Sequence, residues 1–370
     1  MIEDIKKYYN KSIINHKNNI FIKILGFFAR YYYYKNEYSL NIIDLFFNKS
    51  VFFEINNIGK ERMPLPWFIQ LEPTTKCNFN CEFCTRKTYS EEDKNNDLKL
   101  ELVKKIIKEN KNLKFIKYQG MGESLLNLNN QEIIKFIRKN NINLSIITNG
   151  SLLINKNMRD FLLNNFKNIT ISVDSVNKEE FESIRKGGNF NNIVKGIKSL
   201  IEERNNNNNK VKIRTSFVIS HKNYKNIPNY IQFFKKINID EIGFAEIENW
   251  KIKTDQDFLD NQNFVLKERE IRKNIFNFLN RENLTNDFNF NYLLEKDYKR
   301  KKKCLWGFTK IFITSKGILT PCCIRMEEKY KLGNVLENDF KNTWNNNNLR
   351  KFRIANIKNK DNIYCNYCPD

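Results

Sequence analysis

Residues 74–85 read TTKCNFNCEFCT and place Cys77, Cys81 and Cys84, three of the eight cysteines of the chain, on one short segment. A structural zinc site takes four ligands, and disulfides use cysteines in pairs. Three closely spaced thiols fit neither pattern, because they leave a bound metal with an open coordination position. The segment directly follows an apolar run, FIQLE at 68–72, which predicts a strand.

From this strand onward, short apolar runs alternate with longer stretches of helical period. The predicted strands are 68–72, 115–119, 144–148, 169–173, 211–219 and 241–247, and the predicted helices are 97–110, 130–139, 155–165, 178–204 and 223–237. Alternation of this kind is typical of a parallel sheet covered by helices. Six such units predict an α/β fold, a partial (β/α)6 TIM-like barrel.

Unusual residues follow the first four predicted strands. They are the cysteine segment, then Gly120-Met121-Gly122-Glu123, then Thr148-Asn149-Gly150, then Ser172 and Asp174. Glycine or asparagine after a single strand commonly forms only a turn. In βα barrels, however, active sites gather at the carboxyl ends of the strands, so the four groups together predict a site on one rim.

Four regions divide the chain. Residues 1–62 are expected to form a helical N-terminal extension, 63–250 the barrel and 251–300 a helical linker. Residues 301–370 contain short apolar runs, a hairpin signal at Lys316-Gly317 and the remaining five cysteines. They predict a small, separate cysteine-rich module.

Composition narrows the class of protein. The net charge of +22 arises from lysines spread along the whole chain, often beside Asn and Ile, which indicates compositional bias and disfavours a nucleic-acid partner. No signal peptide is apparent at the N-terminus, so we expect a cytoplasmic protein whose cysteines serve metal or redox chemistry. The aromatic stretch 21–34 predicts an amphipathic helix that docks on its own protein, with peripheral membrane contact as the alternative.

The spacing Cys77-x3-Cys81-x2-Cys84 after a strand, with Phe83 before the last cysteine, resembles the signature of the radical SAM superfamily. The resemblance implies that the three thiolates hold a [4Fe–4S] cluster and that its fourth iron binds S-adenosylmethionine (SAM). It also implies reductive cleavage of SAM to a 5′-deoxyadenosyl radical, fed by a flavodoxin- or ferredoxin-type electron donor. A zinc site completed by His221 or a remote cysteine is the alternative.

By the same resemblance, further residues look like SAM ligands. Gly120, Gly122 and Glu123 are similar to the family segment that receives the SAM amino group, although Ser124 stands where the family commonly has proline. Ser172 and Asp174 look like ribose contacts, and Arg185 looks like the arginine that meets the SAM carboxylate. The alternatives are a solvated loop acid at 123, a strand-end hydrogen bond at 172, a helix cap at 174 and a helical salt bridge at 185.

The C-terminal cysteines resemble an SPASM module or the shorter twitch module. Cys304-x12-Gly317-x4-Cys322 and the terminal Cys365-x2-Cys368 supply four ligands, which the resemblance assigns to a second, auxiliary [4Fe–4S] cluster. Cys323 is an alternative to Cys322, and a zinc knuckle is the alternative to the cluster.

An auxiliary cluster favours oxidation of a peptide or small-molecule substrate. Oxidation needs a proton acceptor, for which Glu246 and Glu248 after the sixth strand are candidates, with ordinary surface acids as the alternative. Two other classes of function stay open: a radical SAM enzyme that modifies RNA, and a non-catalytic zinc-binding scaffold protein.

Overall fold

The computed structural model describes residues 63–220, 222–246, 277, 281, 304, 306–323 and 325–357. The predicted N-terminal helices and the linker therefore lie outside the described residues, apart from isolated positions, as do His221, Glu248, Cys365 and Cys368. Within the described part of the chain, no helix has the length and apolar character needed to cross a bilayer.

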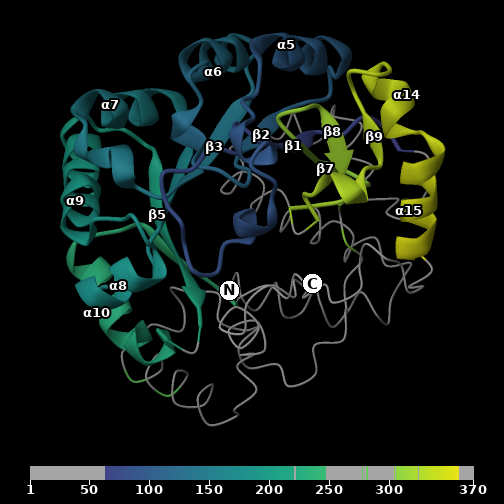
Figure 1. The fold of residues 1–370 in the computed structure, drawn as a ribbon. Helices are drawn as coiled ribbons and strands as arrows, with labels where there is room; N and C mark the ends of the chain where they lie inside the picture. Colours follow the sequence, from purple (N-terminus) through teal and green to yellow (C-terminus); the bar gives the residue numbers. More distant parts are fainter. Residues whose placement is uncertain are drawn as a thin grey trace, which may run out of the picture.

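In the part of the chain that the structure describes, six parallel strands form the barrel sheet in sequence order. They are β1 (Phe68–Leu71), β2 (Phe115–Tyr118), β3 (Asn143–Thr148), β4 (Asn168–Ser172), β5 (Lys212–Ile219) and β6 (Glu241–Glu246). The helices between them are α5 (Leu100–Glu109), α6 (Asn130–Lys139), α7 (Lys156–Asn165), α8 (Lys178–Ile184), α9 (Phe190–Asn206) and α10 (Ile227–Lys236). They line the outside of the curved sheet (Figure 1), so the predicted α/β fold with a parallel sheet is confirmed.

Short 3-10 helices lie in the connections of the barrel and, at Glu328–Tyr330, in the C-terminal module. Their bounds are Thr85–Thr88, Asp93–Asn95, Ser124–Leu126, Ser151–Ile154, Tyr224–Asn226 and Glu328–Tyr330. Three of them, Ser124–Leu126, Ser151–Ile154 and Tyr224–Asn226, closely follow a strand at its carboxyl end, so the chain turns tightly there before it enters the next helix.

The two faces of the sheet differ in the residues they carry. In β1, Ile69 and Leu71 are fully buried in the core that also contains Val103 and Ile106 of α5. Because side chains alternate along a strand, Phe68 faces the inside of the barrel, where its ring stacks on Phe115 with centroids 5.4 Å apart. The main core therefore lies between sheet and helices, and the barrel interior contains a separate aromatic layer.

The C-terminal module continues the same sheet. Its strands are β7 (Lys310–Ile313), β8 (Ile318–Thr320) and β9 (Gly333–Asn334), followed by α14 (Phe340–Trp344) and α15 (Asn347–Ile357). β7 pairs with β1 in parallel, from Phe68 opposite Lys310 to Leu71 opposite Ile313, and β8 and β9 follow antiparallel. Gly317 adopts the positive φ of +81° that the predicted hairpin requires.

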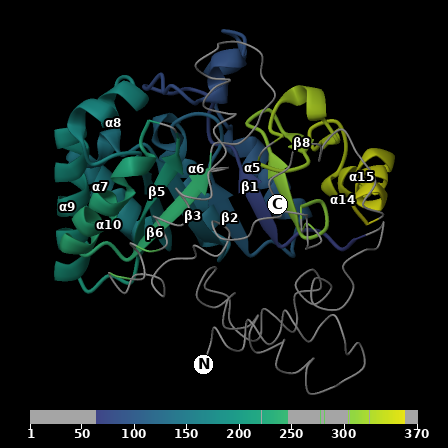
Figure 2. The same cartoon turned by 90° about the horizontal axis from the view of Figure 1, so that it is seen from below.

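The module was predicted to be separate, and the structure differs on this point. Among the described residues, one sheet of nine strands runs from β6 through β1 to β9, and Figure 2 shows it from below. The buried Trp344 adds a second connection, since its Nε1 donates a hydrogen bond to the carbonyl of Pro64 at 2.8 Å. The module and the barrel thus share one framework.

Candidate active site

The loop after β1 carries Cys77, Cys81 and Cys84, which are half-buried and form no disulfide. Two backbone hydrogen bonds attach this cysteine loop to the end of α8 and the residues after it, from the amide of Asn80 to the carbonyl of Lys186 and from that of Glu82 to the carbonyl of Ile184, each 2.8 Å long. The buried ring of Phe79 lies against the glycines that follow Lys186. Contacts within the protein itself therefore fix the shape of the loop.

The glycine segment after β2 holds the other side of the cysteine loop. The amide of Gly122 donates to the carbonyl of Thr74 at 3.1 Å, and that of Glu123 donates to Lys76 at 2.8 Å. A Cβ atom at Gly122 would lie 2.3 Å from the Lys76 carbonyl oxygen and 2.6 Å from that of Thr74. Only glycine permits this approach of two backbones.

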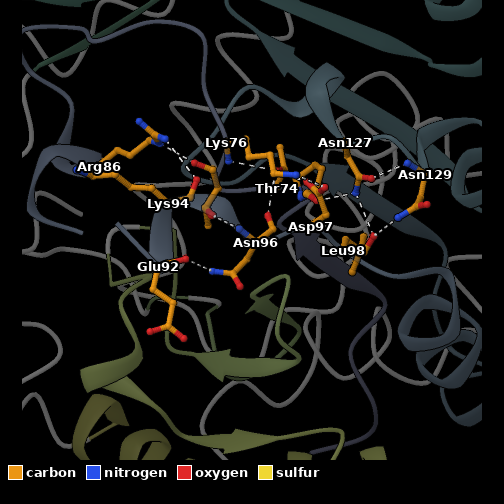
Figure 3. A network of polar contacts seen from close by, with 12 residues as sticks. Thr74, Lys76, Arg86, Glu92, Lys94, Asn96, Asp97, Leu98, Asn127 and Asn129 are labelled. Atoms are coloured by element: carbon orange, nitrogen blue, oxygen red, sulfur yellow. Dashed lines mark hydrogen bonds and ion pairs between the residues drawn. The ribbon is translucent and has the colours of Figure 1, made fainter. Parts of the chain in front are cut away.

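A polar network fixes the start of the loop from outside (Figure 3). Asp97 accepts hydrogen bonds from the hydroxyl of Thr74 and from the Lys76 ammonium, both at 2.6 Å. The buried amide of Asn127 donates to the carbonyls of Pro73 at 2.7 Å and of Leu98 at 3.1 Å. Such supporting contacts hold a site in one geometry without themselves meeting a ligand.

Glu123 is buried between the ends of β2 and β3. Its Oε1 accepts from the hydroxyl of Thr148 at 2.7 Å, and its Oε2 accepts from the amide of Asn149 at 2.6 Å. Burial raises the pKa of this carboxyl, and the same hydrogen bonds act against the rise. Glu123 is therefore a held carboxylate and not a solvated loop acid.

Asp174 and Arg185 form an ion pair, with Nε and Oδ2 2.8 Å apart and both side chains largely buried. The other oxygen of Asp174 accepts from the amide of Val218 at 2.8 Å. The helix cap proposed as an alternative for Asp174 is wrong, because Asn177 is the N-cap of α8 and accepts from the amide of Glu180. Ser172 is half-buried at the end of β4, and Phe83 is half-buried in the cysteine loop.

The electrostatics of the three thiols are dominated by burial. Burial raises the pKa of each thiol, that of Cys81 to about 12, and Arg185 is the strongest influence that lowers the pKa of Cys81. A metal must therefore displace protons that the protein itself does not remove, which is how thiolate sites are loaded. Among the described residues, no three His, Cys, Asp or Glu side chains converge on one point as the ligands of a single ion do. Three thiols on one fixed, partly buried loop suit a cluster in which each binds a different iron.

The auxiliary cysteines are described in part. Cys304, Cys322 and Cys323 are half-buried and form no disulfide, whereas Cys365 and Cys368 lie outside the described residues. Cys323 packs against a small apolar cluster of Met121, Phe312 and Met326, and so does Cys84 from the cysteine loop. One apolar cluster thus contacts both groups of cysteines.

Glu72, immediately after β1, belongs to the site but was not predicted. It is 3% exposed; its Oε1 accepts from the amide of Met121, and its Oε2 from the amide and hydroxyl of Ser315, each at 3.1 Å. Burial is the main cause that raises the pKa of this carboxyl. A cavity of about 380 Å³ adjoins it, between the residues 88–96 and the turn of the β7–β8 hairpin. The sequence signal for Glu72 was a charged residue at the end of the apolar run 68–72, and the structure buries the other four side chains of that run.

Of the two predicted proton acceptors, Glu246 and Glu248, the structure describes the backbone of Glu246 alone. Glu246 ends β6, which puts its backbone at the same rim as the other residues of the site, and Glu248 lies outside the described residues. Both therefore remain predictions.

Comparison with known proteins identifies the two parts of the chain. Residues 71–234 match the radical SAM superfamily, and residues 304–369 match an iron–sulfur cluster-binding domain, SPASM. A probable GTP 3′,8-cyclase of Methanococcus maripaludis is 26% identical over 79% of this chain and 94% of its own length. The subtilosin biosynthesis protein AlbA of Bacillus subtilis is 24% identical over 79% of this chain and 62% of its own.

Solved structures share the fold at low sequence identity. SuiB of Streptococcus suis superposes with a TM-score of 0.64 at 14% identity, covering 95% of this chain and 78% of SuiB. The enzyme anSMEcpe, solved with bound AdoMet, gives a TM-score of 0.60 at 21% identity over 82% of this chain and 83% of its own. The two domain matches lead to one conclusion: the chain joins a domain of the radical SAM superfamily, residues 71–234, to an SPASM iron–sulfur cluster-binding domain, residues 304–369.

Proposed function

We propose that this radical SAM enzyme oxidatively modifies a peptide. Its family supplies a [4Fe–4S] cluster and SAM, and its SPASM domain supplies auxiliary iron–sulfur chemistry. When bound, these groups provide one-electron cleavage of SAM and removal of a hydrogen atom from the substrate by the resulting 5′-deoxyadenosyl radical.

In this proposal, Cys77, Cys81 and Cys84 hold the SAM-binding cluster. The observation that carries the assignment is the double attachment of their loop, by backbone hydrogen bonds to the glycine segment at Gly122 and to the residues on either side of Arg185. Both attached segments bear residues that the family resemblance links to SAM. The geometry therefore supports a site in which thiols and SAM-binding groups are fixed relative to one another.

The polar residues of the rim would orient SAM. Glu123 would receive the SAM ammonium, because its carboxylate is held at the rim by Thr148 and Asn149. Arg185 would meet the SAM carboxylate, and its ion pair with Asp174 would fix the direction of the guanidinium. Ser172, at the end of the neighbouring strand β4, would contact the ribose.

The auxiliary cluster would use Cys304, Cys322, Cys365 and Cys368. When bound, that cluster would accept an electron from the oxidised substrate. Beside its cysteines, Cys323 packs against the apolar cluster of Met121, Phe312 and Met326, which Cys84 also contacts. The proton released with that electron would go to Glu246 or Glu248 after β6.

A peptide substrate is supported by the relatives. SuiB was solved bound to the precursor peptide SuiA, with a TM-score of 0.63 to this chain, and anSMEcpe was solved with a bound peptide. AlbA, whose name places it in bacteriocin biosynthesis, aligns with 79% of this chain. SuiB and anSMEcpe share their fold with this chain, so these relatives favour a peptide substrate.

A GTP-type substrate is the second candidate function. The alignment with the probable GTP 3′,8-cyclase spans 94% of that enzyme, so the similarity is not confined to the radical SAM core. The two candidates differ in what they consume, which makes them easy to separate.

The test begins with anaerobic reconstitution and measurement of iron and sulfide. The reconstituted enzyme is then given SAM and dithionite with either GTP or a candidate peptide encoded near its gene, and 5′-deoxyadenosine and substrate mass are measured. Peptide-dependent mass loss supports the proposal, whereas GTP consumption coupled to 5′-deoxyadenosine establishes the second candidate. Zinc in place of iron and sulfide would refute both in favour of a scaffold protein. RNA retained at moderate salt would instead indicate an RNA-modifying enzyme.

A further inference from the structure

Glu72 extends from the end of β1 to two segments that belong to different domains. Its Oε1 accepts a hydrogen bond from the amide of Met121, in the glycine segment after β2, at 3.1 Å. Its Oε2 accepts from the amide and the hydroxyl of Ser315, in the turn between β7 and β8, both at 3.1 Å. One buried carboxyl group therefore connects the radical SAM domain with the SPASM domain.

The glycine at position 120 makes this connection possible. A Cβ atom there would lie 2.2 Å from Cγ of Glu72 and 2.8 Å from its Oε1, so the Glu72 side chain crosses directly over the Gly120 backbone. Its Cβ and Cγ are next to the main chain and cannot swing aside as the end of a long side chain can. Glu72 itself therefore requires a glycine at position 120.

The hydrogen bond from Met121 also sets the direction of the peptide unit that joins Gly120 to Met121. Among the described residues every peptide bond is trans, and in a trans unit the N–H and the C=O point in opposite directions. Since the Met121 N–H points at Glu72, the Gly120 carbonyl points away from it. β2 lies between β1 and β3 in the sheet, and Glu123 is held from the β3 side. Glu72 and Glu123 thus fix the two ends of the glycine segment from opposite neighbours.

The side chain of Met121 gives the same segment further support. Its sulfur accepts a hydrogen bond from the hydroxyl of Thr85, which adjoins Cys84, at 3.3 Å. The side chain also packs against Phe312 and Met326, both in the SPASM domain. Met121 is therefore held by its backbone and by its side chain, from the cysteine loop and from the SPASM domain.

These contacts give Glu72 a role that rests on the proposed function. SAM carries an ammonium group, and a carbonyl oxygen that is already fixed in direction binds such a donor without a further loss of conformational freedom. We infer that Glu72 is a positioning residue for SAM, because it turns the Gly120 carbonyl toward the SAM ammonium, which Glu123 also meets. Ser315 keeps Glu72 in place, so binding of SAM to the radical SAM domain depends on donors that the SPASM domain supplies.

The test compares Glu72→Gln with Glu109→Gln. A glutamine at position 72 keeps one acceptor oxygen, which the two donors of Ser315 can occupy, and it presents an NH2 group to the amide of Met121. Glu109 also links the domains, because it accepts a hydrogen bond from the amide of Phe340 at 2.7 Å. It ends α5, which leads into the start of β2, so it lies at the opposite edge of the sheet from the glycine segment. Glu109→Gln therefore weakens a contact between the domains without reaching the SAM site.

Two measurements are made on each protein. Hydrogen–deuterium exchange of residues 119–126, followed by mass spectrometry on the full-length protein without SAM, reports the hydrogen bond of the Met121 amide. Isothermal titration with SAM after reconstitution reports the affinity. Ser315→Ala, alone and combined with Glu72→Gln, shows whether the SPASM hydroxyl acts through Glu72. Because it removes only a hydroxyl, it also keeps the test available if Glu72→Gln does not fold.

We expect faster exchange of residues 119–126 in Glu72→Gln and SAM binding weaker by about fivefold or more, the factor that corresponds to one hydrogen bond of about 1 kcal/mol. Glu109→Gln should match the wild type in both measurements. Ser315→Ala should weaken SAM binding by itself and add nothing to Glu72→Gln.

Unchanged exchange and affinity in Glu72→Gln, equal losses in Glu109→Gln, or additive losses in the double variant would overturn the inference. If the reconstituted wild type does not bind SAM, the proposed function fails instead. The exchange measurement needs no SAM, so it still decides whether Glu72 holds the glycine segment.

Discussion

Gly122 lies where the cysteine loop and the glycine segment touch, so Gly122→Ala is a direct test of that contact. The new Cβ atom would lie 2.3 Å from one backbone carbonyl oxygen and 2.6 Å from another, distances that real Cβ atoms essentially never show. Backbone atoms cannot rotate away as a side-chain end can. The segment must therefore move, and the hydrogen bonds from Gly122 to Thr74 and from Glu123 to Lys76 are strained or lost.

The expected loss follows from these contacts. Each backbone hydrogen bond contributes about 1 kcal/mol net, and steric overlap of this kind costs roughly 1–3 kcal/mol. We therefore expect the free energy of unfolding of the apoprotein in urea to fall by about 3 kcal/mol. SAM binding to the reconstituted protein should weaken as well, because Glu123 moves with the segment.

Gly243→Ala is the matched control. A Cβ atom there meets only the carbonyl of Thr215, at an ordinary 3.7 Å, so this variant should unfold at the same urea concentration as the wild type or at a slightly higher one. Both variants are measured by urea denaturation and by isothermal titration with SAM. If Gly122→Ala stays within about 0.5 kcal/mol of Gly243→Ala and binds SAM normally, the contact does not support the site as we argue.

Three further predictions concern other parts of the framework. Cys81→Ala should abolish 5′-deoxyadenosine formation and lower the iron content, whereas Cys323→Ala should retain the activity; equal iron loss in both would contradict the assignment. Burial raises the pKa of Glu72 in the folded protein above its ordinary 4.5, so the carboxyl contributes stability that is present below pH 4.5 and is lost as the pH rises through the folded-state pKa. The free energy of unfolding of the wild type relative to that of Glu72→Gln should therefore fall as the pH rises from 4.5 through the folded-state pKa, which urea titrations at a series of pH values can measure. Arg353 is fully buried and donates hydrogen bonds to the carbonyls of Gly307 and Trp344, so Arg353→Ala should lower the free energy of unfolding by about 3 kcal/mol and shift the fluorescence of Trp344. An unchanged midpoint of urea unfolding would contradict this role.

The parallel barrel could be predicted from local pattern. The predicted strands and helices agree with β1–β6 and α5–α10 to within a few residues, because each element has a clear apolar period and ends at turn residues. The pairing of β7 with β1 was not predicted. These strands are far apart in sequence, and nothing in either apolar run specifies which partner it pairs with.

Residues of the site were predicted singly, and their mutual contacts were not. Asp174 and Arg185 were each expected to meet SAM, yet their ion pair depends on how α8 returns to the sheet. Glu72 was missed because charged side chains are seldom buried, so its position suggested only a strand end. Its three donors come from segments as distant as Met121 and Ser315, a convergence that only the folded chain makes visible.

The parallel pairing of β7 with β1 has a consequence for any attempt to shorten the chain. Within the described residues, β1 is covered on one side by β2 and on the other by β7. Removing the SPASM domain would leave the backbone amides and carbonyls of β1 unpaired along a hydrophobic edge, which is a template for intermolecular strand addition. A barrel produced alone should therefore aggregate or exchange strands, so the two domains are expected to fold as a single unit.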